Sequence, residues 1–231
     1  MFSLHTLPIW LIAGLVFCLQ PCHAQNGGDV SLSFVSFPKS TEPVKVKLWL
    51  GEGKSLDIEA PSKWLSPPVR VAASGAWVVG ETVNGPDGKQ AFKELGRTTA
   101  PASSDQILLL VRKGKTSADG FDLIALDARV SEFGAGKYLF MNATKVDIAG
   151  VVGEEKFVIK PNQHQILTPK IPKDEHTVHT SLYFRKGDQA DAKPFFSSEW
   201  RISDDARNMV FFYHDPQTTH IRLHTIKDYL P

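Results

Sequence analysis

Cysteine is almost absent from this sequence, and its scarcity excludes several kinds of protein. The 231 residues include 2 Cys, at positions 18 and 22. If a signal peptide covers that region, the mature chain has no thiol, which excludes a disulfide framework, a thiol nucleophile and cysteine-ligated zinc. Hydrophobic cores alone must then stabilise the mature chain, which is feasible for domains of about 100 residues each.

The chain also lacks an excess of charge of either sign. It has 26 Lys and Arg against 25 Asp and Glu, which gives a formal net charge of +1. Proteins that bind nucleic acids usually carry a basic surface that shows in this balance, so we expect no DNA or RNA partner. The hydrophobic content of 42% differs from that of disordered chains and indicates that the mature chain folds.

Only the N-terminus contains a hydrophobic run of the kind found in targeting segments. Residues 9–19 are apolar but too few to cross a bilayer comfortably, which is typical of the core of a signal peptide. Cys22 and Ala24 are small residues at the positions expected before cleavage ahead of Gln25. The first eight residues contain no Lys or Arg, and an uncleaved membrane anchor is the alternative. We predict a signal peptide over residues 1–24, a periplasmic or extracellular location, and no transmembrane segment in the mature chain.

Four segments recur in the same order in the second half of the chain. The pairs are 46–58 with 148–159, 92–97 with 196–201, 105–111 with 207–213, and 123–126 with 223–226. Because the starts of the four pairs are offset by 102, 104, 102 and 100 residues, the order and spacing indicate an internal duplication. Chance similarity between two β-rich stretches is the alternative. A boundary in the glycine-containing segment 130–136 divides the mature chain into domains at 25–130 and 131–231.

Period-two alternation predicts β-strands in both halves. In the segment 44–50, valine and leucine alternate with lysine, the pattern of a strand with one face in a core and the other in water. Residues 107–111 and 209–213 are unbroken apolar runs, as expected for central strands buried on both faces. Frequent turn signals separate these strands. We therefore predict an all-β fold of two tandem immunoglobulin-like antiparallel β-sandwich domains.

One short segment has a helical rather than a strand pattern. Phe92 and Leu95 are three residues apart, and Gly96 follows as a stop signal. This spacing predicts one or two turns of helix over residues 90–95.

A local motif in the second half resembles one found in a group of secreted proteins. A predicted strand ends Phe-x-Asn-x-Thr at residues 140–144, and a glycine-centred hairpin then closes on Ile-Lys-Pro at residues 159–161. The motif is similar to that of uncharacterised secreted bacterial β-sandwich proteins, although the first half has Ser36 and Pro38 in place of the Asn and Thr. The resemblance implies a fold and an exported location, but no activity and no functional residues. We interpret the Asn-Ala-Thr triplet at residues 142–144 as a turn at the end of a strand rather than a glycosylation site.

A phosphate-binding loop is suggested by residues 51–55 but excluded by their surroundings. The segment reads Gly-Glu-Gly-Lys-Ser, whereas the motif requires an earlier glycine where this chain has Leu48. It also lies between two predicted strands rather than before a helix. We interpret it as a hairpin turn.

All the histidines beyond the predicted signal peptide lie in the second half, which raises the question of a metal site. On a strand, His220 and His224 are about 13 Å apart at 3.3 Å per residue, so they cannot share one ion. His176 and His179 face opposite sides of an extended segment. A metal site would need His214 or His164 to converge from another strand. We predict surface histidines and no metal site.

Catalytic patterns are also weak in this sequence. No Gly-x-Ser-x-Gly motif is present. Glu199, Asp204 and Asp205 are candidates for a carboxylate pair of a glycoside hydrolase, but Ser203 and the two aspartates are more typical of a turn. We predict no catalytic residues, no cofactor and no enzymatic activity.

Aromatic residues are concentrated near the C-terminus and provide the last indication of function. They are Phe195, Phe196, Trp200, Phe211, Phe212 and Tyr213. An exposed group of Trp200, Tyr213 and His214 would form a surface for a ligand or a partner, whereas core packing is the alternative. Our preferred hypothesis is a non-catalytic exported protein that has a structural role or binds an envelope or extracellular protein. The alternative is a carbohydrate-binding or carbohydrate-active protein that uses these aromatic residues with Glu199 or His214.

Overall fold

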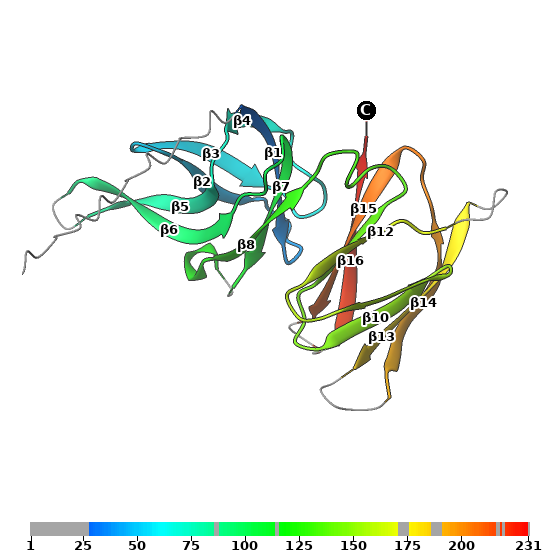
Figure 1. The fold of residues 1–231 in the computed structure, drawn as a ribbon. Helices are drawn as coiled ribbons and strands as arrows, with labels where there is room; N and C mark the ends of the chain where they lie inside the picture. Colours follow the sequence, from blue (N-terminus) through cyan, green and yellow to red (C-terminus); the bar gives the residue numbers. More distant parts are fainter. Residues whose placement is uncertain are drawn as a thin grey trace, which may run out of the picture.

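The computed structural model describes residues 28–85, 88–113, 116–170, 176–185, 191–215, 218 and 220–230. The predicted signal peptide lies outside this part of the chain. No helix within the described residues has the length and apolar character needed to cross a membrane. Within the described residues, the regular secondary structure is β-strand apart from one turn of 3-10 helix, η1 (Ser117–Asp119), and the strands form the two units seen side by side in Figure 1. The predicted all-β fold is confirmed.

The first eight strands form two four-stranded sheets, which we call the first sandwich. Sheet A has the order β4-β1-β7-β8 and sheet B the order β3-β2-β5-β6. Apolar side chains from both sheets meet between them. The strands are β1 (Asp29–Phe37), β2 (Val44–Gly51), β3 (Lys54–Ala60), β4 (Val69–Ala72), β5 (Ala76–Asn84), β6 (Gln90–Thr99), β7 (Asp105–Arg112) and β8 (Phe121–Asp127).

The last eight strands form the second sandwich, again from two four-stranded sheets. Sheet C has the order β12-β9-β15-β16 and sheet D the order β11-β10-β13-β14. A separate apolar core lies between them. The strands are β9 (Tyr138–Asn142), β10 (Asp147–Val152), β11 (Glu155–Ile159), β12 (His164–Leu167), β13 (Thr177–Arg185), β14 (Lys193–Arg201), β15 (Ala206–His214) and β16 (Ile221–Tyr229).

The two sandwiches have the same topology, strand for strand, with β9 to β16 in the places of β1 to β8. The pairing is not purely antiparallel, which corrects one detail of the predicted sandwiches. The first strand of each sandwich lies parallel to the seventh, β1 with β7 and β9 with β15. A parallel pair needs a long connection, and here the intervening strands provide it.

The four repeated segments lie on strands that correspond in this topology. They fall on β2 and β3 with β10 and β11, on β6 with β14, on β7 with β15, and on β8 with β16. The match between β6 and β14 needs a shift of two residues. The pairing with β5 and β13, which correspond to each other, shows this shift. The second residue of β5, Trp77, pairs with Thr98, and the second residue of β13, Val178, pairs with Trp200. Trp200 therefore corresponds to Thr98, whereas the sequence match placed it opposite Gly96.

The helical turn predicted over residues 90–95 is wrong, because this segment begins β6. A register shift between Val79 and Gly80 forms a β-bulge in the ladder of β5 and β6, and both Leu95 and Gly96 are buried there. The bulge breaks the period of two and imitates a helical spacing. Phe92 packs on the other face of the strand, where a Cβ on Gly80 would come within 2.5 Å of its ring.

The glycine-rich segment at residues 51–55 is a hairpin turn, as predicted. It joins β2 to β3, and Gly51, Glu52 and Gly53 have φ angles of 89°, 50° and 75°. Glycine adopts this left-handed region without steric cost, which explains its presence on both sides of Glu52. The segment has no helix N-terminus to which a phosphate could bind.

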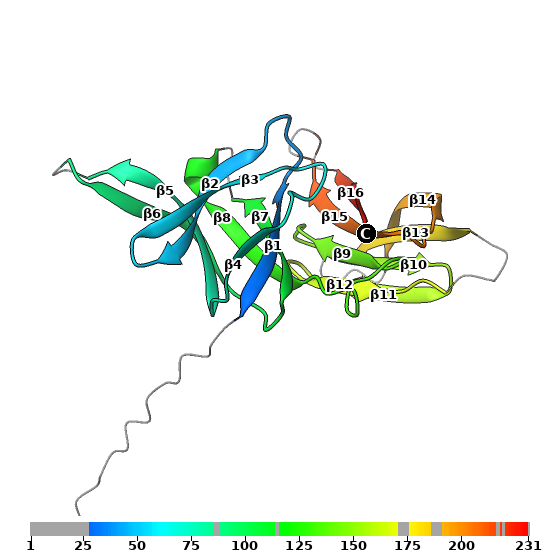
Figure 2. The same ribbon diagram turned by 90° about the horizontal axis from the view of Figure 1, so that it is seen from above.

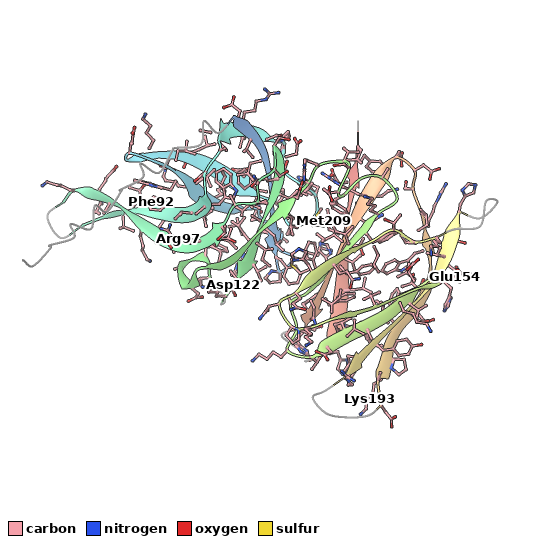
Figure 3. The ribbon with its side chains drawn as sticks, in the orientation of Figure 1. Phe92, Arg97, Asp122, Glu154, Lys193 and Met209 are labelled. Carbon is pink, nitrogen blue, oxygen red and sulfur yellow. The ribbon has the colours of Figure 1, made fainter. Side chains whose placement is uncertain are left out.

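Sheets A and C also pack against each other, through the faces that point away from their own sandwich cores. Figure 2 shows this arrangement from above, and Figure 3 shows Met209 between the two units. We call the buried side chains at this contact the interface core. They are Val35, Phe37, Ile107, Leu109, Leu126, Ala128, Phe133, Leu139, Met141, Met209, Phe211 and Ile226.

The interface core explains the unbroken apolar runs of the sequence. Leu108 and Leu110 point into the first sandwich, while Ile107 and Leu109 point into the interface core. Strand β15 is buried in the same way on its two faces. The prediction that residues 107–111 and 209–213 are central strands buried on both faces is confirmed.

The connection between the sandwiches, residues 128–137, is held by one buried arginine. Arg207 donates hydrogen bonds from Nη1 to the carbonyl oxygens of Ala128 at 2.6 Å and Phe133 at 2.8 Å. Its Nε donates to Oδ2 of Asp228 at 2.8 Å, and its guanidinium lies 4.9 Å from the centroid of the Phe133 ring. The connection is therefore fixed to β15 and β16.

Candidate functional site

Trp200 belongs to the core of the second sandwich rather than to an exposed aromatic surface. Its ring stacks on Tyr138, with centroids 5.4 Å apart, and on Phe140 at 6.0 Å. The hydroxyl of Tyr138 donates to the carbonyl oxygen of Arg201 at 3.1 Å, and burial raises the pKa of Tyr138 to about 12. The indole ring of Trp200 is partly buried. Trp200 is the next-to-last residue of β14, and its ring packs β14 against β9.

Tyr213 and His214 follow each other on β15 and therefore point to opposite faces of sheet C. Tyr213 packs against the interface core, where its ring meets that of Phe37 edge-on with centroids 5.1 Å apart. His214 instead lines a cavity inside the second sandwich. The structure thus distributes Trp200, Tyr213 and His214 over three environments and does not bring them together at one surface.

The cavity beside His214 has a volume of about 770 Å³. It lies where β13 and β15 end and where β14 and β16 begin. Its apolar wall is formed by Val146, Phe184, Phe195 and Ile221. A volume of this size falls within the range of about 300 to 1,000 Å³ that is typical of small-molecule sites.

The apolar wall of the cavity is continuous with the buried core. The ring of Phe195 lies 6.2 Å from that of Phe184 and meets the ring of Phe212 edge-on, also at 6.2 Å between centroids. Phe212 is fully buried. The wall is therefore held in place by core packing.

The polar wall of the cavity is formed by Lys145, His214, His220 and Arg222. No Asp or Glu lies among the described residues that line the cavity. Nε of Arg222 lies 3.5 Å from Oδ2 of Asp215, so the charge of this arginine is partly balanced. Lys145 and His220 are exposed, and their side chains make no hydrogen bond or ion pair within the described chain. The electrostatic character of the mouth is cationic.

The loop that carries Lys145 and Val146 is positioned by Asn142, which is fully buried at the end of β9. Its Nδ2 donates to the carbonyl oxygens of Val146 at 2.7 Å and Ile159 at 2.9 Å, and its Oδ1 accepts from the hydroxyl and the backbone N–H of Thr144. The interpretation of this triplet as a turn at the end of a strand is confirmed. In the first sandwich the hydroxyl of Ser36 donates to the carbonyl oxygen of Ala60.

A second polar group lies on the outer face of sheet D, across β13 and β14. Nδ1 of His179 is 2.8 Å from Oε1 of Glu199, and Nε2 lies 3.0 Å from the hydroxyl of Ser181 and 3.2 Å from that of Ser197. The order of carboxylate, imidazole and hydroxyl is that of a proton relay. His179 and Ser181 alternate on β13, and Ser197 and Glu199 alternate on β14, which the sequence shows. The sequence does not show that β13 pairs with β14, so reasoning from the sequence did not find this group.

Within the described strands, the backbone beside this group offers no free N–H donors for an oxyanion. Ser181 pairs with Val151 on one side and with Ser197 on the other, so the backbone groups around it are used in the two ladders. An acyl-transfer site needs free N–H donors aimed at the developing charge. Both His179 and Glu199 are also largely exposed, with side-chain exposures of 60% and 59%. The arrangement holds β14 against β13 and provides a polar outer face.

The other histidines occupy separate positions. His164 lies on the edge strand β12, and Nε2 of His224 lies 2.8 Å from the carbonyl oxygen of Ser62 in the other sandwich. Within the described ranges, no three His, Cys, Asp or Glu side chains lie close enough to hold a metal ion. His220 and His224 do not share a site, since one lines the cavity and the other contacts the first sandwich. The turn predicted at residues 203–205 is confirmed, with the hydroxyl of Ser203 donating to Asp205.

Comparison with known proteins adds no assignment to this geometry. No protein-family pattern and no curated protein sequence matches the chain.

Proposed function

We propose that this protein is an exported, non-catalytic scaffold that recognises another protein in the envelope or outside the cell. The observation that carries the proposal is the interface core, which joins sheet A to sheet C through fully buried side chains. Domains within a chain usually move relative to each other unless a large apolar interface joins them. Two sandwiches fixed in this way present one continuous surface, which suits the binding of a partner across both units.

The proposal includes a division of the chain and a site of processing. We propose a signal peptide over residues 1–24, a first domain over 25–130 and a second over 131–231. The common topology of the two sandwiches supports their origin as two copies of one unit.

The carbohydrate hypothesis has less support from the geometry. It requires exposed rings on which a sugar can stack, whereas Trp200 is stacked within a core and Tyr213 packs against the interface core. A sugar-binding protein would present at least two such rings in one groove.

Export can be tested on the full chain with a C-terminal tag in a bacterial host. We expect the protein outside the cytoplasm, with a new N-terminus at Gln25 identified by intact mass and N-terminal sequencing. An unprocessed chain in the cytoplasm would contradict the export part of the proposal.

Partner recognition can be tested with a photo-crosslinker placed on the outer faces of sheets B and D. Glu59 on β3 and Val158 on β11 are exposed there, and each can be replaced one at a time. We expect a discrete adduct from the envelope fraction that disappears when unlabelled protein competes. If neither position gives a competable adduct and the protein is retained on polysaccharide gels, the carbohydrate hypothesis replaces the proposal.

A further inference from the structure

The two sandwiches differ at one corner, although their topology is the same. In the first sandwich β6 lies alongside β8, and a Cβ on Gly96 would come within 2.7 Å of the carbonyl oxygen of Phe121. In the second sandwich β14 and β16 do not approach in this way over their described lengths. Instead of a closed edge, this corner contains the cavity lined by His214.

One pair of corresponding residues explains why this corner is filled in the first sandwich and hollow in the second. Phe121 pairs with Arg112 at the start of β8, and Ile221 pairs with His214 at the same place in β16. The Phe121 side chain is 1% exposed and fills the corner of the first sandwich. Ile221 is smaller and only partly buried, so space remains beside it. The cavity is therefore a feature of the second copy and not of the shared fold.

The chemistry of the walls defines the ligand. Phe184, Phe195 and Ile221 provide an apolar interior, while Lys145 and Arg222 lie at the exposed mouth. A neutral apolar molecule would make no ion pair with Lys145, whose side chain has no partner within the described chain, and a cationic molecule would be repelled by Lys145. Arg222 is only partly balanced by Asp215, so it adds to the attraction for an anion. A small polar anion would gain nothing from the aromatic wall.

We propose that the second sandwich binds a small amphipathic anion, with its apolar body in the cavity and its carboxylate at Lys145 and Arg222. A medium-chain carboxylate fits this description, since its chain replaces water along the rings and its head group pairs with exposed cations. This site is independent of the protein-recognition role proposed above, because it lies inside the second sandwich and not on the outer faces of sheets B and D.

The site can be tested by isothermal titration calorimetry of the full protein with decanoate, decanol and decyltrimethylammonium. The two charged probes are used below their critical micelle concentrations, and decanol is used below its solubility limit in water. The three probes have the same chain and differ in the charge of the head group. We expect decanoate to bind at one site, with a dissociation constant at least tenfold lower than that of either other probe. Equal affinity for the anionic and cationic probes would overturn the proposal.

Two substitutions test separately how the space in the cavity and the positive charge at its mouth contribute to binding. Ile221→Phe places at this corner the residue that fills it in the first sandwich, and we expect it to abolish decanoate binding without lowering the denaturation midpoint. Lys145→Glu should raise the dissociation constant at least tenfold, whereas Lys156→Glu, the same charge change on the exposed face of β11, should leave it unchanged. Wild-type affinity in Ile221→Phe, or equal losses in the two lysine variants, would overturn the proposal.

Discussion

The interface core leads to a prediction that two neighbouring residues can test. Phe211 and Phe212 are consecutive on β15, and both are almost fully buried, at 1% and 0% exposure. Phe211 points into the interface core, where its ring stacks on Phe37 with centroids 5.5 Å apart. Phe212 points into the core of the second sandwich, 5.9 Å from Phe140. The substitutions Phe211→Ala and Phe212→Ala therefore remove the same group from the same strand on opposite faces.

Each substitution should lower the free energy of unfolding by about 3 to 5 kcal/mol, the usual loss when a buried phenylalanine becomes alanine. The difference lies in where the packing is lost. Phe211→Ala leaves a void against β1 and β7 of the first sandwich, whereas Phe212→Ala leaves one facing sheet D. About 3 kcal/mol corresponds to a little more than a hundredfold change in the population of an open state.

Hydrogen exchange followed by mass spectrometry reads the two sandwiches separately. In Phe211→Ala we expect faster exchange in β1 and β7, and less change in β10 and β13. In Phe212→Ala we expect the reverse, with faster exchange in β10 and β13. Comparison of the two maps removes any component that both variants share through global unfolding. Identical maps would refute the reasoning that sheet A and sheet C support each other through this contact.

Three further substitutions test single contacts. Asn142→Ala should lower the free energy of unfolding in urea by about 2 to 3 kcal/mol, because it leaves two carbonyl oxygens without their donor and the N–H and hydroxyl of Thr144 without their acceptor. An unchanged midpoint would contradict this role. Arg207→Met should cost about 3 kcal/mol in thermal unfolding, since it leaves the carboxylate of Asp228 without its partner, and a loss below 0.5 kcal/mol, the range of ordinary surface changes, would argue against a structural ion pair. The hydrogen bond from Arg129 lowers the pKa of Asp127 to about 2. This stabilisation is present above about pH 4 and is lost as the pH falls toward 2. Because solvent screens an ion pair at the surface, Asp127→Asn should be less stable than the wild type by only about 1 kcal/mol at pH 6. The two proteins should converge near pH 2 in acid titrations followed by circular dichroism.

The sequence predicted the strands well where burial controls the pattern. The alternation over residues 44–50 and the unbroken runs over 107–111 and 209–213 follow directly from one-sided and two-sided burial. It failed over residues 90–95, because a β-bulge adds one residue to β6 and changes which side chains face the core. It also misaligned β6 with β14 by two residues, a shift that leaves the same side chains facing the core and that the burial pattern therefore does not reveal.

The candidate site was less accessible to prediction than the fold. His214 was selected from the sequence, but its companions were expected to be Trp200 and Tyr213 rather than Phe184 and Phe195. Neighbours along one strand point to opposite faces, so closeness in sequence is a poor guide to a shared site. The residues that share the cavity come from five different segments, and only the pairing of strands brings them together.

The parallel pairing of β1 with β7 affects the order in which each half can assemble. Ser31 lies beside Asp105, and in the second half Tyr138 lies beside Asn208, which are separations of 74 and 70 residues along the chain. The first strand of each sandwich is therefore synthesised long before the seventh strand, with which it pairs. Contacts between positions so distant in the sequence slow folding. Until residue 105 has been synthesised, β1 has β4 as a neighbour on one side only, and the edge that pairs with β7 and the face that contacts sheet C stay open. Each half is thus exposed to aggregation for most of its synthesis, and a holding factor that binds extended apolar segments would act during this interval.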